Sequence, residues 1–571
     1  MVTHILQEVF LSQLNRSQPA EELQLARSSS RAGMSEVPPR MVAMPDGSSF
    51  YVTTPIFYVN DVPHIGHAYT EVAADVLARW HRQRGDRTWS LTGTDEHGQK
   101  ILRSATANGV TPKEWTDRLV KEAWEPLLET LNLANDDFIR TTEERHERCV
   151  SRFLNDLNEA GYIYSSEFEA LYCVGCEEFK PESEIVKGTG AFEGEKVCAI
   201  HSKPLELLQE TNYFFRLSEF QDRLLELYES RPDFIQPAAA RNEVMSFVRS
   251  GLKDLSISRT TFDWGVKVPW DESHVVYVWF DALLNYISAI GYGEADEKFN
   301  ATWPALHIVG KDILRFHAVI WPAMLMAAGI PAPAGIFGHG WLLVGGEKMS
   351  KSKLTGIEPT QITDVFGSDA FRYYFMRAIH FGQDGSFSWE DLSARYQAEL
   401  ANGFGNLASR VIAMVIKYFD GAVPELGELT AADQAIIDRT NTAATKADAA
   451  IERIAIDDAI AEIWKLVDEL NGYITEQEPW VLAKNEETKP RLATVLATAI
   501  QGLGALAILL NPITPIACEK LWQALGGEGS LAEQRIADAA NWKGAGRVEK
   551  LAALFPRIDQ EVPETPTPKG A

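Results

Sequence analysis

The chain has 571 residues, enough for roughly two to four domains that each bury a core of their own. Lys and Arg number 54 against 80 Asp and Glu, so the formal charge is −26, which excludes a general coat protein for nucleic acids. Five cysteines in a chain of this length exclude a disulfide scaffold and indicate a reducing compartment. Any contact with RNA must therefore come from local basic or aromatic patches.

Residues 1–47 differ in character from the rest of the chain. They are polar and lack sustained periodicity, which predicts a disordered N-terminal extension. The run Ser28–Arg31 is typical of a transit peptide, but Glu8, Glu21 and Glu22 argue against one, and no secretory signal is recognisable. We therefore expect a cytoplasmic protein.

A histidine-containing turn joins the first predicted strand, 50–54, to a helical pattern over 68–80. A strand that feeds a helix through a tight turn points the first free backbone N–H groups of the helix at a ligand above the sheet, and phosphate suits that position. Gly66 permits close approach of a ligand, and His64 and His67 share one face of the first turn. Taken alone, these residues also fit a capped helix start with two surface histidines.

The second predicted strand, 88–92, ends in a cluster of polar residues that includes Asp95. Open α/β sheets bind ligands at the carboxyl ends of their parallel strands. Asp95 could therefore accept a hydrogen bond from a ligand ammonium group, although a helix N-cap is an equal local interpretation. Helical patterns follow over 112–131 and 143–160.

Four potential metal ligands come next, in two short motifs. Cys173 and Cys176 form a C-x2-C pair, and Cys198 and His201 form a C-x2-H pair after 21 intervening residues. Three sulfur ligands with one imidazole suit tetrahedral zinc, and four protein ligands leave no open position, so the metal would be structural. The alternative is that these side chains bind no metal.

The α/β pattern then resumes after this insertion. The run 275–281 predicts a strand, 282–290 a helix, 307–310 another strand, and 335–344 a last strand before a lysine-rich loop. The sequence therefore predicts one sheet that the cysteine-bearing insertion interrupts.

Long helical patterns dominate from residue 396 onward. Apolar residues over 456–470 recur at helical spacing, whereas 491–510 is apolar nearly all round and should be the central helix of a bundle. The uncharged run 493–518 is also long enough to cross a membrane, but its glycines and prolines favour the bundle. The tail after residue 558 is rich in proline and acidic residues, which predicts a mobile segment.

The lysine-rich loop reads Lys348-Met-Ser350-Lys351-Ser352. Two lysines around a small hydroxyl residue could close over a polyphosphate, although such a run is more often a solvated surface loop. Together with His64-Ile-Gly-His67, it resembles the two signature sequences of class I aminoacyl-tRNA synthetases, and neither motif deviates from the signature.

The order of these motifs is similar to that of the methionyl-tRNA synthetases over residues 50–558. The resemblance implies activation of L-methionine with ATP and Mg²⁺, and then transfer of methionine to the 3′ end of tRNA(Met), initiator tRNA included, for translation initiation and elongation. It implies an α/β fold class, with a Rossmann-like parallel-sheet catalytic domain that a zinc-bearing insertion splits and an all-α helical bundle follows. The implied parts are the disordered extension 1–47, the first catalytic half 48–155, the connective insertion with its zinc knuckle 156–265, the second catalytic half 266–345, the lysine loop and stem-contact region 346–395, the anticodon-binding bundle 396–558 and the flexible tail 559–571.

The same resemblance implies a set of site residues. The catalytic residues would be His64, His67, Lys348 and Lys351, and the ATP site would consist of His64, Gly66, His67, Lys348, Ser350, Lys351 and Ser352. The methionine site would consist of Ile56, Tyr58, Asp95, Trp279, Ala282, Leu283, Tyr286, Ile313 and His317. This composition fits the ligand, because a polarizable thioether packs well against aromatic edges.

The implied anticodon-reading residues are Asn406, Arg410 and Trp480. Asn406 and Arg410 lie one turn apart on a predicted helix, and a tryptophan offers a surface for an unstacked base. One structural Zn²⁺ would be held by Cys173, Cys176, Cys198 and His201. The expected partners are tRNA and methionine, with no membrane or DNA, and a monomer is expected rather than a dimer.

Three other interpretations stay open on the sequence alone. A sister synthetase for leucine, isoleucine or valine would need a long editing insertion, but only 280 residues separate the two signatures, and a cysteine enzyme would place zinc in the active site. A nucleotidyltransferase of similar sheet would make a small adenylate without tRNA. A non-catalytic zinc-containing module would bind RNA without turning over ATP.

Overall fold

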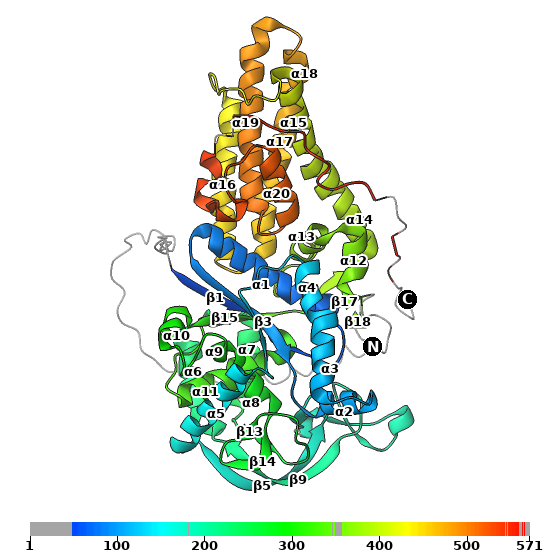
Figure 1. Cartoon of the computed structure of the whole chain (residues 1–571), viewed down its shortest axis with the longest axis vertical. Coiled ribbons are helices and arrows are strands. Elements are labelled where there is room, and N and C mark those ends of the chain that lie inside the picture. The colour runs from blue at the N-terminus through cyan, green and yellow to red at the C-terminus, as the bar shows by residue number, and fades with distance from the viewer. Residues whose placement is uncertain are drawn as a thin grey trace, which may run out of the picture. The chain divides into compact units, whose positions relative to one another are not determined.

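A seven-stranded parallel sheet lies at the centre of the first half of the chain (Figure 1). The strand order is β10-β16-β15-β1-β3-β2, with β4 also paired to β3, and every pairing is parallel. Parallel strands of this kind are buried on both faces, and the last six residues of β3 are all buried although they include serine, threonine and aspartate. The strands are β1 (Ser49–Thr53), β2 (Phe57–Tyr58), β3 (Arg87–Asp95), β4 (Asp137–Arg140), β10 (Ile235–Gln236), β15 (Ala305–Gly310) and β16 (Gly335–His339).

The computed structural model describes residues 48–180, 182–344, 347–348, 357–542, 544, 546–558, 562–563 and 565. The extension 1–47 and residues 349–356 of the lysine-rich loop therefore lie outside the described residues. Of the expected tail, 559–571, only residues 562, 563 and 565 are described, and Thr565 there donates hydrogen bonds to Glu390.

Helices connect the first strands. The long helix α1 (Ile65–Arg84) follows the histidine turn, as the sequence predicts. The predicted helical segment 112–131 consists of α3 (Pro112–Leu119), a π-helical turn and α4 (Glu125–Thr130), and the segment 143–160 is α5 (Glu144–Glu159). A shorter helix, α2 (Gln99–Ala107), begins directly beyond the end of β3.

The insertion is built on a four-stranded antiparallel sheet. Its strands are β5 (Ile163–Cys173), β6 (Glu178–Phe179), β9 (Glu206–Phe215) and β11 (Leu255–Ser256), and a separate hairpin pairs β7 (Ile185–Lys187) with β8 (Lys196–Cys198). Helices α6 (Gln221–Ser230) and α7 (Ala238–Arg249) follow. Strand β10 lies between these helices and pairs with β16, so the chain visits the parallel sheet within the range expected for the insertion.

The predicted strand 275–281 is wrong beyond Val276. Strand β14 (Asp271–Val276) pairs antiparallel with β12 (Ser258–Arg259) and β13 (Lys267–Val268), outside the parallel sheet. Helix α8 (Val278–Ala282) begins directly afterward, because the carbonyl of Tyr277 already accepts the amide of Asp281 at 3.0 Å. Helix α9 (Asn285–Ser288) continues the turn. A uniformly apolar run carries no period, so it does not separate a strand from a buried helix.

The chain from residue 296 to residue 395 adds two further strands to the parallel sheet and forms a small separate sheet. Strands β15 and β16 match the predicted segments 307–310 and 335–344, although the latter breaks after His339. The small sheet comprises β17 (Leu342–Val344), β18 (Glu347–Lys348) and β19 (Gly385–Phe387), and the helices of this region are α10 (Asp296–Thr302), α11 (Trp321–Ala327), α12 (Pro359–Phe366), α13 (Ser368–Ala378) and α14 (Trp389–Arg395).

The last part of the described chain is a helical bundle (Figure 1). Its helices are α15 (Asn406–Phe419), α16 (Ala431–Ile451), α17 (Ile456–Gln477), α18 (Pro479–Leu482), α19 (Lys489–Leu510) and α20 (Pro515–Ala524). The predicted apolar face of α17 is buried, and α19 is the central helix. The segment Glu486–Leu510 is long and apolar enough to cross a membrane, but 89% of its most apolar window is buried inside the protein, as in the core helix of a bundle.

Helix α1 joins the sheet to the bundle. The indole N–H of Trp80 donates to Asp448 of α16 at 2.9 Å, and Asn511 donates to the side chain of Gln83 at 3.1 Å. Nearby, Arg372 of α13 pairs with Asp75 of α1 at 2.6 Å, and both side chains are buried. Arg372 also donates to the backbone carbonyl of Pro512 at 2.7 Å, so one guanidinium connects α1, α13 and the end of α19.

Candidate active site

A cavity of about 360 Å³ opens at the carboxyl ends of the parallel strands. Asp95 ends β3, Gly310 ends β15 and His339 ends β16, and all three line the cavity. This is where open α/β sheets bind ligands. Eight of the predicted site residues line it, namely Ile56, Tyr58, His64, Gly66, His67, Asp95, Trp279 and Ile313.

The two histidines of the first signature are stacked on each other, with ring centroids 3.8 Å apart. The Nδ1 atom of His64 accepts the backbone N–H of Gly66 at 3.0 Å, and Nδ1 of His67 accepts the backbone N–H of His64 at 3.1 Å. A neutral imidazole that accepts at Nδ1 carries its proton on Nε2. Both rings are therefore Nε2–H donors, the form that a phosphate oxygen requires.

The backbone amides at the start of α1 differ from the prediction. The N–H of Ile65 donates to the carbonyl of Ile357 at 2.9 Å, the N–H of Gly66 to the ring of His64, and the N–H of His67 to the carbonyl of His64 at 3.0 Å. The expectation of free amides that face a ligand is therefore wrong. The helix supplies its dipole and two oriented imidazoles instead.

Asp95 is the buried acid of the cavity. The register of β2 on β3 pairs Tyr58 with Asp95, so the two side chains leave neighbouring strands at the same level. Asp95 is only 6% exposed, and its Oδ1 atom has no hydrogen-bond partner among the described residues. Burial raises the pKa of Asp95 well above its usual value, and the negative charge of Asp281 raises it further. A ligand cation would both pair this oxygen and favour the ionised carboxylate.

A buried ionic network lies next to Asp95. Asp281 of α8 accepts from His97 at 2.6 Å and from His146 of α5 at 2.7 Å. Burial alone would raise the pKa of Asp281, but the two imidazoles lower it to about 2. For His97, burial lowers the pKa and the charge of Asp281 raises it more, so the net shift is upward. These two hydrogen bonds hold α8 against α5 and against the segment that follows β3, which positions Trp279.

Trp279 lines the cavity and stacks on Phe316 with centroids 4.0 Å apart. Tyr286 and His317 are buried and are not among the lining residues. The His317 Nδ1–H donates to the carbonyl of Ile313 at 3.0 Å, so its Nε2 accepts the hydroxyl of Tyr286 at 2.7 Å. Burial lowers the pKa of His317 to about 4, which keeps the ring neutral at pH 7. Ala282 and Leu283 are likewise buried and do not line the cavity, so a direct contact of these four with methionine stays a prediction.

Sequence reasoning missed several residues that line the cavity. Asp312 follows the end of β15 and His339 is the last residue of β16, so their position at the carboxyl ends of parallel strands was a usable signal. Lys100 on α2 and Glu177 beside the cysteine motif also line the cavity, and no pattern in the sequence predicts their convergence.

Glu177 ties the insertion to this cavity. Its carboxylate accepts the hydroxyl of Tyr58 at 3.1 Å, the hydroxyl of Tyr172 at 2.5 Å and the backbone N–H of Lys100 at 2.6 Å. The Tyr58 hydroxyl also contacts the carbonyl of His97 at 2.8 Å. Glycine is required at position 98, because a Cβ there would lie 2.6 Å from the Tyr58 hydroxyl oxygen and the backbone has a φ of +102°.

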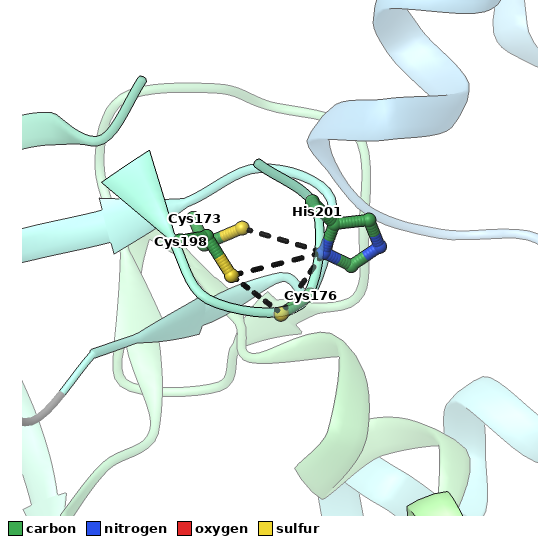
Figure 2. Close-up of side chains that lie close together, drawn as sticks. All are labelled: Cys173, Cys176, Cys198 and His201. Carbon is green, nitrogen blue, oxygen red and sulfur yellow. Dashed lines mark hydrogen bonds between the residues drawn. The ribbon is translucent and has the colours of Figure 1, made fainter. Parts of the chain in front are cut away.

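The predicted zinc ligands converge. Cys173, Cys176, Cys198 and His201 point toward one another, and their ligand atoms all lie within 4.8 Å (Figure 2). The Sγ atoms of Cys176 and Cys198 are 3.7 Å apart, and the His201 Nδ1 lies 3.3 Å from Cys176 and 3.9 Å from Cys198. A tetrahedral zinc with bonds of about 2.3 Å to sulfur and 2.0 Å to nitrogen spaces its ligands about 3.5–3.8 Å apart, so the four residues fit the metal.

The second signature is only partly described. Lys348 belongs to strand β18, and Ser350, Lys351 and Ser352 lie outside the described residues. Their contact with ATP therefore stays a prediction.

The predicted anticodon residues lie on the bundle. Asn406 begins α15 and is exposed, and Arg410 one turn later is half-buried. Trp480 is the second residue of α18 and is 38% exposed, so its indole is not buried in the bundle. The neighbouring Val481 is 40% exposed, so the helix presents an apolar surface to solvent.

Comparison with known proteins identifies the family of this chain. Residues 50–412 match the family described as tRNA synthetases class I (M), and residues 433–562 match the anticodon-binding domain of tRNA ligase. The methionine–tRNA ligase of Streptomyces coelicolor is 59% identical over 523 residues, which cover 90% of this chain and 97% of that protein. The chain belongs to the methionine–tRNA ligase family. The ligase of Thermotoga maritima is 43% identical over 512 residues, or 89% of this chain and 80% of that protein.

Solved structures of the methionine–tRNA ligase family agree with the fold. The Mycobacterium tuberculosis methionyl-tRNA synthetase in complex with methionyl-adenylate has a TM-score of 0.85 at 40% identity and covers 89% of this chain and 100% of that one. The apo form of the same synthetase gives 0.80 at 37% identity. The predicted class I sheet with a helical C-terminal region is confirmed.

Proposed function

We propose that the chain activates L-methionine with ATP and charges tRNA(Met). The observation that carries this proposal is the unpartnered buried oxygen of Asp95, which lies in one cavity with the Nε2–H donors of His64 and His67. One side of the cavity suits an ammonium group and the other suits phosphate. An amino acid bound between them has its carboxylate beside the α-phosphate of ATP.

In the first step, the methionine carboxylate attacks the α-phosphorus, the bond to the β-phosphate breaks, and pyrophosphate leaves. His64 and His67 donate hydrogen bonds to the phosphate oxygens, while Lys351, helped by Lys348, neutralises the charge that develops on the departing phosphates. Mg²⁺ enters with ATP as part of the substrate. The protein contributes position and charge stabilisation rather than covalent chemistry.

The methionine side chain lies among Ile56, Tyr58, Trp279 and Ile313, with its ammonium group on Asp95. These apolar and aromatic walls suit a thioether. Tyr286 and His317 form the hydrogen-bonded pair beyond this wall, and Ala282 and Leu283 complete the packing around α8.

In the second step, a hydroxyl of the terminal adenosine attacks the methionyl carbonyl, and AMP leaves. Asn406, Arg410 and Trp480 read the anticodon, and initiator and elongator tRNA(Met) both serve as substrates. Base stacking on Trp480 is the mode by which single-stranded loops are commonly bound.

Zinc on Cys173, Cys176, Cys198 and His201 would hold the two knuckles of the insertion together and has no position left for catalysis. We also propose the division into parts at residues 47, 155, 265, 345, 395 and 558, a monomeric state and a cytoplasmic location for translation.

The decisive experiment is ATP–pyrophosphate exchange with each of the twenty amino acids in the absence of tRNA. Exchange with methionine alone is expected. Exchange with leucine, isoleucine or valine would overturn the pocket assignment, and no exchange with any amino acid would overturn the proposed activity. The Lys351→Ala variant should exchange about a hundredfold more slowly, with a smaller change in the KM for methionine.

A further inference from the structure

A fully buried histidine, His146, binds an acid close to the proposed methionine site without lining the cavity. Its Nε2 atom on α5 lies 2.7 Å from Oδ1 of Asp281, which is also fully buried. The other oxygen of Asp281 lies 2.6 Å from Nδ1 of His97, and His97 comes two residues after Asp95. The proposed binding of methionine to Asp95 does not by itself require a second buried acid with two imidazoles.

The hydrogen bonds of His146 place a proton on each nitrogen of its ring. Nε2 faces the Asp281 carboxylate, which can only accept, so Nε2 carries a proton. Nδ1 lies 2.9 Å from the hydroxyl oxygen of Ser288, and that hydroxyl donates to the carbonyl of Asn285 at 3.1 Å. A hydroxyl has a single proton to donate, so its oxygen accepts from Nδ1–H. An imidazole with protons on both nitrogens is positively charged, whereas His97 needs only its Nδ1–H to donate to Asp281.

The charges of the surrounding groups favour the same protonation state. An ionised carboxylate buried among neutral groups is costly, and an imidazolium 2.7 Å from Asp281 offsets that cost. Glu96 is buried too, but the guanidinium of Arg140 already binds both of its oxygens, at 2.6 and 2.8 Å. Glu147 follows His146 on α5 and is exposed to solvent. Asp281 is therefore the acid whose charge His146 balances.

We infer that His146 is a buried imidazolium that balances the charge of Asp281, so that Asp95 keeps the negative charge that binds the methionine ammonium group. The inference rests on the proposed binding of methionine to Asp95. Without a balancing charge, Asp281 would repel the negative charge of Asp95 and favour its protonated form, which attracts no ammonium group. His146 acts through Asp281 and touches no substrate, so it is a positioning residue.

Variants that change charge separately from packing test this inference. His146→Gln keeps a hydrogen-bonding side chain but removes the charge. The KM for methionine in pyrophosphate exchange at pH 7 should therefore rise about tenfold or more, while kcat and the KM for ATP stay within about twofold of wild type. Addition of Asp281→Asn to His146→Gln removes the unbalanced negative charge, and the KM should return to within about threefold of wild type. A KM in the double variant as high as in His146→Gln, or higher, would assign the residues a packing role only and overturn the inference.

A second buried histidine gives a matched control for these variants. His274 of β14 lies 2.9 Å from the hydroxyl of Ser258 and 3.6 Å from Asp271, so it also has one hydroxyl partner and one acid partner. His274→Gln should leave kcat and both KM values unchanged. A rise in the KM for methionine equal to that of His146→Gln would show that loss of any buried histidine has this effect, and would contradict a specific role for His146.

The pH profile separates a charge effect from a packing effect. Burial raises the pKa of Asp95 and the charge of Asp281 raises it further, so loss of the balancing imidazolium should raise the pKa again. Methionine affinity falls as Asp95 becomes protonated, and in His146→Gln this fall should therefore begin at a higher pH than in wild type. A loss of affinity by the same factor at every pH would overturn the inference.

The protonation state is measured directly by NMR of the full-length protein labelled with 15N-histidine. The difference between the spectra of wild type and His146→Gln assigns the ring, and Asp281→Asn supplies the difference if His146→Gln does not fold. Protons on both ring nitrogens of His146 at pH 8 are expected, and a ring with one proton would overturn the inference. Absence of methionine-dependent exchange in the wild type would contradict the proposed function instead, and the spectrum would still report on His146.

Discussion

Tyr58 and Asp95 stand opposite each other across two parallel strands, although 36 residues of turn, helix and strand separate them in the sequence. The same tyrosine contacts the backbone of His97 and the carboxylate of Glu177. One aromatic side chain therefore connects the buried acid of the cavity to the cysteine-bearing insertion. The wall of the proposed methionine pocket and its charged end are held by one set of contacts.

The raised pKa of Asp95 predicts a pH dependence of methionine binding. Only the ionised carboxylate attracts the substrate ammonium group, so affinity should be full at high pH and should fall as the pH drops through the raised pKa. Bound methionine supplies a positive charge and should lower that pKa. The KM for methionine in pyrophosphate exchange, measured from pH 5.5 to 8.5, checks this. A flat profile would contradict the role of Asp95.

The Asp95→Asn variant extends this test to stability. The asparagine amide stays neutral, so the cost of a buried charge disappears. The thermal midpoint should therefore stay equal or rise by about 1–3 °C. The KM for methionine should rise at least about a hundredfold, because the partner of the ammonium group is lost. The sign follows because a carboxyl whose pKa is raised in the folded state destabilises the protein above its unfolded pKa. The exposed Asp222 of α6 gives a matched control, and Asp222→Asn should change neither quantity.

Because His67 carries its proton on Nε2, the variants His67→Asn and His67→Gln should differ in their rates of pyrophosphate exchange. A glutamine amide can place an N–H near the position of Nε2, whereas an asparagine amide reaches only the position of Nδ1. His67→Asn should therefore slow pyrophosphate exchange about a hundredfold, and His67→Gln should lose markedly less. Equal losses would contradict the assignment of Nε2–H as the donor.

The cysteine cluster predicts one zinc per chain. Cys198→Ser should lose the metal and lower the thermal midpoint, because the knuckle loses the bond between its two halves. Metal content by atomic absorption and the thermal midpoint are the measurements. Cys149→Ser replaces a buried thiol of α5 outside the cluster and should keep a full equivalent of zinc. Retention of zinc in Cys198→Ser would rule out this ligand.

Local patterns predicted some features well because the physical cause was itself local. The convergence of the four potential metal ligands follows from their spacing, and the histidine turn follows from a strand that meets a helix. The run 275–281 failed because it is apolar throughout, so only the start of α8 at Val278 shows that Trp279 lies on a helix. The prediction of free amides at α1 failed because the N–H of Ile65 donates to the carbonyl of Ile357 in a distant segment, while His64 accepts the N–H groups of Gly66 and His67.

Contacts between distant segments were beyond the reach of pattern reasoning. Asp75 and Arg372 are 297 positions apart, and neither lies in a motif. Lys100 and Glu177 meet only because α2 starts where the insertion folds back on Tyr58. Such pairs depend on topology, and a charged residue in a single sequence carries no sign of its eventual partner.

The ion pair between Asp75 and Arg372 predicts a large loss of stability when one partner is removed. Arg372→Met would leave the buried Asp75 with Arg79 as its remaining ion-pair partner and the backbone N–H of Ala134 as a hydrogen-bond donor. The free energy of unfolding should fall by about 3–5 kcal/mol. Urea unfolding followed by tryptophan fluorescence measures the shift. Arg453→Met, at an exposed arginine of the bundle, should leave the midpoint unchanged.

The exposed indole of Trp480 predicts a selective effect on tRNA. Trp480→Ala should weaken tRNA(Met) binding about tenfold or more, since a stacked base is worth about 1–3 kcal/mol, and Trp480→Phe should retain part of it. Pyrophosphate exchange should not change in either variant. An unchanged affinity for tRNA in Trp480→Ala would contradict anticodon stacking.

Helix α1 has 20 residues and so runs about 30 Å from the stacked histidines to the bundle. Its last turns depend on partners that come hundreds of residues later, including Asp448 for Trp80 and Asn511 for Gln83. A fragment cut after Arg395 would leave these groups and the apolar side of α13 in water. The sheet should therefore not survive as a soluble minimal enzyme. A truncation that keeps the protein folded must therefore keep the bundle, because the helix that carries the histidines needs the bundle to pair its last turns.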